Sequence, residues 1–137
     1  MTIRAPDRMA RGEGTPMSIE LNHTIVPAHD KEAAAQFFAR MFGLAVDAPF
    51  GPFSPVRING GLTLDFADRE TFEPHHYAFF VDDAEFDRIF ERVQRAGIPF
   101  SADPHAKEMG RINHRKGGRG FYFRDLDGHV LEVLTRP

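Results

Sequence analysis

Hydrophobic and polar residues alternate with two different periods from Ile19 onward. Apolar positions at helical spacing predict two helices, one over 30–42 with Asp30 as its N-cap, and one that starts at Asp82 or Asp83 and ends at Gly97. Short apolar segments bounded by Gly, Pro, Asn or Asp predict strands at 21–26, 44–46, 56–58, 62–67, 76–81, 98–100, 120–124 and 130–135. Residues 1–18 lack periodicity and are expected to form a flexible tail.

The predicted elements occur in the same order twice. Residues 57–66 (RINGGLTLDF) overlay residues 124–133 (RDLDGHVLEV) without a gap, which places Asp65 on Glu132, and His23 matches His76 in the first strand of each half. Each half alone would leave one face of a small sheet exposed, and pairing the two halves buries these faces. We expect an α+β fold, in which βαβββ modules 19–68 and 75–136 form a single domain, 19–136, with one curved eight-stranded sheet around a metal-bearing cavity.

Composition narrows the chemistry. The 137 residues include no cysteine, which excludes disulfides, thiolate metal sites and a cysteine nucleophile. A net charge of -3 gives no basic surface for nucleic acid. No apolar stretch is long enough to cross a bilayer, so we expect no membrane partner, and the absence of a secretory signal predicts a cytoplasmic location.

Imidazole and carboxylate groups are expected on one face of the sheet. Strand alternation points His23, His76, Asp65 and Glu132 inward if the helices cover the other face. Such groups suit one divalent metal (Zn, Mn, Fe, Ni or Co) and leave positions open for a substrate. A lone strand histidine is more often structural, and the neighbouring His75 is an alternative ligand. Asp65 is a candidate fourth ligand, an acceptor behind the ligands, or an ordinary hairpin residue.

The basic loop from Arg111 to Arg119 is the second candidate feature. It is either a mobile loop that grips an anionic substrate or a solvated loop whose glycines permit turns. Arg119 and Tyr122 are the predicted substrate-binding residues. His129, beside the last hairpin turn, is expected to be exposed, and His114 is a weak acid/base candidate.

The segments LNHTIV, HHYAFFVDDAEF and GFYFRDLDGHVLEV carry a resemblance to a known superfamily. Across 19–136 the chain resembles the vicinal oxygen chelate superfamily of glyoxalases, bleomycin resistance proteins, extradiol dioxygenases and fosfomycin resistance enzymes. The resemblance implies paired βαβββ modules, a metal held by His23, His76 and Glu132, and a metal that chelates two neighbouring substrate oxygens. It also implies a homodimer, often with modules exchanged between the two chains.

The local similarity to fosfomycin-modifying thiol transferases is incomplete. The segment before FYF is Lys116 to Gly120, where those enzymes resemble each other in a loop with serine and acidic residues, and Ile25 stands where they carry threonine. Both departures argue against fosfomycin as the substrate.

Three functions remain open on the sequence alone. The first is a metal-dependent enzyme (lyase, isomerase, transferase or dioxygenase) acting on a small oxygenated molecule, with Glu132 or Asp65 as the group that moves a proton. The second is a protein that sequesters an antibiotic or metabolite in a pocket lined by Phe50, Phe53, Phe80 and Phe100. The third is an architectural dimer with a vestigial site. Retention of both histidines and the glutamate favours the enzyme.

Overall fold

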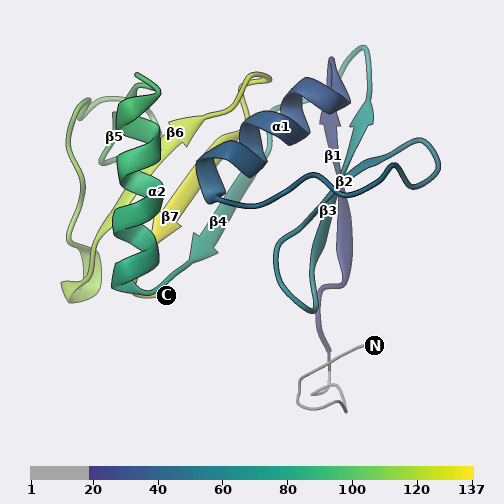
Figure 1. Cartoon of the computed structure of the whole chain (residues 1–137). Helices are drawn as coiled ribbons and strands as arrows, with labels where there is room; N and C mark the ends of the chain where they lie inside the picture. The colour runs from purple at the N-terminus through teal and green to yellow at the C-terminus, as the bar shows by residue number, and fades with distance from the viewer. Residues whose placement is uncertain (1–18) are drawn as a thin grey trace. The chain divides into compact units, whose positions relative to one another are not determined.

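The structure is a computed structural model that describes residues 19–137, and the tail predicted for residues 1–18 lies outside the described residues. The chain folds into two compact units (Figure 1). The first contains residues 19–39 and Leu44–Thr71, and the second contains Arg40–Gly43 and Phe72–Pro137. In the described part of the chain, no helix is both long and apolar enough to cross a membrane.

The first unit is built on a three-stranded sheet in the order β1-β3-β2. Strand β1 (His23–Ala28) pairs in parallel with β3 (Thr63–Asp68), and β2 (Ser54–Arg57) pairs antiparallel with β3. Helix α1 (Lys31–Phe42) begins where the carboxylate of Asp30 accepts hydrogen bonds from two backbone N–H groups, as predicted. Its Phe38 ring lies 6.0 Å from that of Phe66, so α1 covers the face of the sheet that carries Phe66.

The second unit repeats this plan with a four-stranded sheet in the order β4-β7-β6-β5. The sheet consists of β4 (His76–Phe80), β5 (Phe100–Ser101), β6 (Gly120–Arg124) and β7 (Val130–Leu134). Helix α2 (Asp83–Arg95) lies over this sheet (Figure 1). The carboxylate of Asp82 caps the helix, and Phe86 and Phe90 pack against Phe121 of β6. A short helical turn, η1 (Arg115–Gly117), precedes β6.

Strand pairing confirms the sequence overlay between the two halves. His23 pairs with Thr63 in the first sheet, and His76 pairs with Val130 in the second, which are the positions that the overlay makes equivalent. By the same register, Asp65 lies opposite Ile25 as Glu132 lies opposite Ala78. The two parallel pairs therefore have the equivalence that the sequence overlay predicted.

The expected continuous eight-stranded sheet is not what the structure shows. The described residues form strands in two sheets, of three and four strands. The segment predicted as a strand at 44–46 is reduced to an isolated bridge between Val46 and Val56. The Pro- and Gly-rich stretch that follows adds a second isolated bridge, between Phe50 and Phe53, but no strand, since its prolines have no N–H to donate to a continuous ladder.

Candidate functional site

The predicted ligands of the second unit lie together on the sheet face opposite α2. His76 and Glu132 project from the neighbouring strands β4 and β7, and the imidazole Nε2 lies 3.0 Å from the carboxylate Oε1 of Glu132. The Glu132 side chain is 18% exposed and that of His76 is 46% exposed, so the pair is open to solvent on one side. Alternation along β7 sends Leu131 and Val133 into the core and leaves Glu132 on the open face.

Tyr122 extends this pair into a chain of polar contacts. Its hydroxyl donates to Oε2 of Glu132 at 3.0 Å and accepts a hydrogen bond from the guanidinium of Arg115 in η1. Register explains the first contact, because Tyr122 of β6 pairs directly with Glu132 of β7. Burial raises the pKa of the Tyr122 phenol; Arg115 opposes this shift and Glu132 adds to it. Tyr122 is therefore a neutral donor that orients the carboxylate.

The second unit supplies two side chains of the kinds that bind divalent metals. The Nε2 of His76 and the Oε1 of Glu132 are joined by a hydrogen bond of 3.0 Å. Imidazole and carboxylate groups are both ligands of divalent metals such as Zn²⁺, so the pair supplies two donors that a bound ion would take in place of this hydrogen bond. Within residues 19–137, however, no three His, Asp or Glu side chains lie together as a group able to hold an ion. The structure thus brings together two of the three predicted ligands.

The other two predicted groups belong to the first unit. His23 is exposed at the start of β1, and its Nδ1 lies 2.8 Å from the side-chain oxygen of Asn22. Asp65 is 7% exposed on β3, at the position equivalent to Glu132. By strand register, His23 and Asp65 share the face opposite the one that α1 covers. Their roles as ligand and proton carrier stay predictions.

His75, the alternative ligand, has different neighbours. Its Nδ1 lies 2.6 Å from the hydroxyl of Tyr77, and its ring contacts those of Tyr77 and His129. The imidazole that lies against Glu132 is that of His76.

The prediction that His129 is exposed is wrong. The residue is completely buried, its ring contacts those of Phe72 and Tyr77, and its Nδ1 accepts the backbone N–H of His75 at 2.8 Å. The turn before it is held by the carboxylate of Asp125, which accepts the backbone N–H groups of Asp127 and His129. His129 continues the inward alternation of Leu131 and Val133, a signal that the sequence already contained.

Arg119, predicted to bind substrate, faces helix α2. Its guanidinium forms ion pairs with Asp87 at 2.8 Å and Asp83 at 3.1 Å and stacks over the ring of Phe86. A hydrogen bond to Asp87 is the main reason that the pKa of Arg119 is raised. A substrate role for Arg119 stays a prediction, but the cation that contacts Tyr122 is Arg115, which sequence reasoning did not single out.

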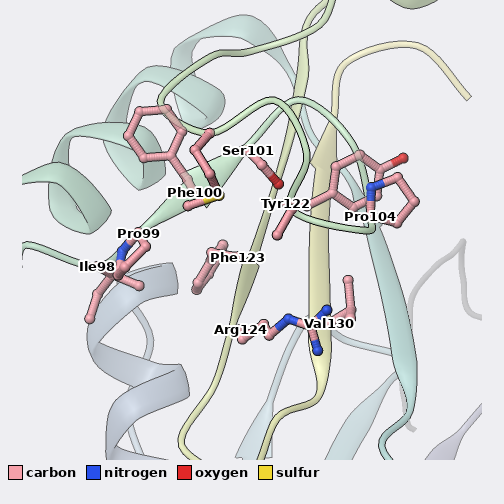
Figure 2. A pocket seen from close by; sticks show the side chains of 11 residues that line it. Ile98, Pro99, Phe100, Ser101, Pro104, Tyr122, Phe123, Arg124 and Val130 are labelled. Atoms are coloured by element: carbon pink, nitrogen blue, oxygen red, sulfur yellow. The ribbon is translucent and has the colours of Figure 1, made fainter.

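A cavity of about 210 Å³ adjoins this polar chain (Figure 2). It lies in the second unit, with strands β5 and β6 on one side and the loop that follows β5 on the other. Its walls include Phe100, Met109, Tyr122 and Phe123. Of the phenylalanines predicted to line a pocket, Phe100 does so here, whereas Phe50 and Phe80 are exposed. Tyr122 belongs both to the cavity wall and to the polar chain, and it is the residue that connects the cavity with Glu132.

The loop that lines one side of the cavity is held by a buried carboxylate. Asp103 accepts backbone N–H groups of Glu108, Lys107 and His105 at 2.7, 2.8 and 3.1 Å. Burial alone would raise the pKa of Asp103, but these three donors outweigh it and lower the pKa. Asp103 is therefore charged at neutral pH and fixes the loop from inside.

Comparison with known proteins agrees with this architecture. The sequence model of the Glyoxalase/Bleomycin resistance protein/Dioxygenase superfamily matches residues 20–133. The chain is 52% identical to the oxidase ChaP-H2, with a TM-score of 0.85 over 88% of this chain and 96% of that one. The oxidase ChaP-H1 is 50% identical, with a TM-score of 0.84 over 88% and 98% of the two chains. Glutathione transferase FosA from Serratia marcescens is 24% identical over 82% of this chain and 78% of its own.

Proposed function

The chain belongs to the Glyoxalase/Bleomycin resistance protein/Dioxygenase superfamily, and we propose that it is a metal-dependent enzyme, of the oxidase type, that acts on a small oxygenated molecule. The observation that carries the proposal is the pairing of His76 and Glu132, whose donor atoms lie 3.0 Å apart on an open sheet face beside a cavity. Identity of 50% or more to two proteins named as oxidases favours oxidation over the other chemistries of the superfamily.

In this proposal His76 and Glu132 hold the metal, and His23 of the first module is the third ligand, from the same chain or from a second copy. The assignment of His23 rests on the repeat, since its register on β1 and β3 matches that of His76 on β4 and β7. A bound divalent metal would act as a Lewis acid that chelates two neighbouring oxygens of the substrate. Elemental analysis of the purified protein identifies the metal among Zn, Mn, Fe, Ni and Co.

The protein's own residues supply orientation and proton handling. Tyr122 holds one carboxylate oxygen of Glu132, which leaves the other directed at His76. Arg115 in turn fixes the phenol, so its proton points at Glu132. Asp65, almost fully buried at the position equivalent to Glu132, is proposed to carry a proton alongside Glu132.

A homodimer is part of the proposal. Ile25 shares the strand face of His23 and is 41% exposed, and Leu21, just before β1, is 65% exposed. Phe80, on the face of His76, is 65% exposed. In each unit, large exposed apolar side chains beside the candidate histidine indicate a surface that another copy covers. Light scattering after size-exclusion chromatography tests this point; a monomer at micromolar concentration would contradict it.

Chelation is tested with the Co²⁺-loaded protein and two isomeric diphenols. Catechol carries adjacent oxygens and resorcinol does not, so catechol alone is expected to change the visible absorption of the bound cobalt. His76→Ala should abolish the change, while His114→Ala, a histidine of the basic loop, should retain it. Oxygen uptake by the Fe²⁺-loaded protein with catechol then tests oxidase chemistry. An equal response to both diphenols, or none, would contradict bidentate chelation.

The sequestering alternative is favoured by one observation, the largely apolar wall of the cavity. It predicts ligand binding without metal and without turnover. Metal content of the purified protein separates the two functions.

A further inference from the structure

The cavity beside Tyr122 has an uneven distribution of polar groups (Figure 2). Most of its wall is apolar, formed by residues such as Ile98, Phe100, Met109 and Phe123. Its volume of about 210 Å³ lies between the ~150 Å³ that holds benzene and the ~300 Å³ of the smallest pockets for drug-sized ligands. The cavity therefore fits a compact apolar body of one or two rings.

Two polar side chains of the wall have their hydrogens committed to other groups. The hydroxyl of Ser101 donates to the backbone carbonyl of Asp103 at 2.6 Å, and the hydroxyl of Tyr122 donates to Glu132. Neither has a second hydrogen to offer a ligand.

Arg124 differs from both. It lines the cavity from the end of β6, it is exposed, and its guanidinium donates to the carbonyl of Gly128 at 3.5 Å, the limit of a hydrogen bond. A guanidinium has five N–H donors in a fork that matches a carboxylate or phenolate. Arg115 and Arg119, the neighbouring cations, are held by Tyr122 and by the carboxylates of α2.

Register places Arg124 near the predicted metal ligands. Arg124 pairs with Val130 across β6 and β7, and Val130 pairs with His76 across β7 and β4, so the three residues form one row of the sheet. The next row on the same face contains Tyr122 and Glu132. A ligand in the cavity can thus place an anionic group at Arg124 and still reach the His76–Glu132 pair.

We propose that Arg124 is a specificity-determining residue, and that the substrate is a compact, largely apolar molecule whose anionic group pairs with this guanidinium. The proposal rests on the proposed function, because it treats the cavity as the substrate pocket of that enzyme. It assigns three parts to recognition: the apolar wall binds the ring body, Arg124 binds the anion, and the remaining oxygens face Glu132.

The test is calorimetric binding of two probes of equal shape, 2-naphthoate and neutral 2-naphthamide, to metal-depleted protein in metal-free buffer. Removing metal prevents the naphthoate carboxylate from binding at His76 and Glu132 instead. We expect naphthoate to bind about tenfold more tightly than the amide, as a charge-assisted hydrogen bond at a partly exposed site allows. Arg124→Gln should remove this preference, and Arg124→Lys should keep part of it.

Arg95→Gln is the matched control, because Arg95 lies on α2 in an exposed ion pair with Glu91 and does not line the cavity. It should retain the full preference for naphthoate, and Met109→Ala should weaken both probes. An unchanged preference in Arg124→Gln, or failure of both probes to bind the parent, would overturn the proposal. Neither result bears on the metal assignment, which is tested separately by metal content. If the parent protein binds no metal, this binding test remains valid, because it uses metal-depleted protein.

Discussion

Removing one hydroxyl group, by Tyr122→Phe, tests how the polar chain prepares the metal site. The Tyr122 hydroxyl is the donor that holds Oε2 of Glu132, at 3.0 Å, and its side chain is 5% exposed. Phenylalanine fills the same space, so the substitution removes the hydrogen bond to Glu132, together with the one from Arg115, and leaves the ring packing in place. Glu132 then loses the contact that directs its other oxygen toward His76.

The size of the effect follows from the exposure of Glu132. A hydrogen bond to a charged group contributes about 1.5–3 kcal/mol. Because the Glu132 side chain is 18% exposed, water replaces part of the lost bond, and the lower end of that range applies. About 1.4 kcal/mol corresponds to tenfold in affinity. We therefore expect the Kd for Zn²⁺ to rise about tenfold, within the ~10–100-fold range typical of groups that support a metal ligand.

The assay is a competition titration of Zn²⁺ against a chromophoric chelator. Tyr77→Phe is the matched control, because Tyr77 is the other tyrosine of the chain and its hydroxyl contacts His75. The control should bind Zn²⁺ as the parent does. An unchanged Kd in Tyr122→Phe, or an equal loss in both variants, would refute the proposed role of Tyr122.

Three further expectations concern the frame around the site. Arg119→Ala should lower the free energy of unfolding in urea by about 1–2 kcal/mol, since it removes two ion pairs and a stacking contact to α2. An unchanged free energy of unfolding would show that these contacts do not stabilise the fold. Gly43→Ala should cost about 1 kcal/mol in the same assay, because φ is +69°, a conformation that strains any residue with a Cβ. In Tyr122→Phe, ultraviolet titration should show the remaining phenol, Tyr77, with a pKa of about 12, chiefly from burial. Because this pKa lies above the ordinary value of 10, stability should fall as pH rises from 10 to 12, and ordinary titration near 10 would contradict the packing.

Local patterns were sufficient for much of the fold. The Asp30 and Asp82 caps, the apolar stripes of both helices and the last hairpin follow from spacing alone, because short-range rules govern them. The repeat also predicted which histidine of the second half lies beside Glu132, since a sheet with one buried face fixes its register.

Residues whose partners are distant in sequence were harder to place. Arg119 turns toward α2 because Asp83 and Asp87 lie one turn apart on that helix, a pairing that only the packing of α2 on β6 creates. Arg115 reaches Tyr122 because η1 folds back on the sheet, and the loop fixed by Asp103 shapes the cavity. These features depend on how loops pack on the sheet, and hydrophobic periodicity does not describe that packing.

The metal assignment is tested most directly by elemental analysis of protein purified without chelators or a nickel column. We predict close to one divalent metal per chain in the parent, and loss of that metal in His23→Ala, His76→Ala and Glu132→Ala, each with an unchanged circular dichroism spectrum. Full metal content in Glu132→Ala, or a metal-free parent that gains no thermal stability from Zn, Mn, Fe, Co or Ni, would contradict a metal held at this site.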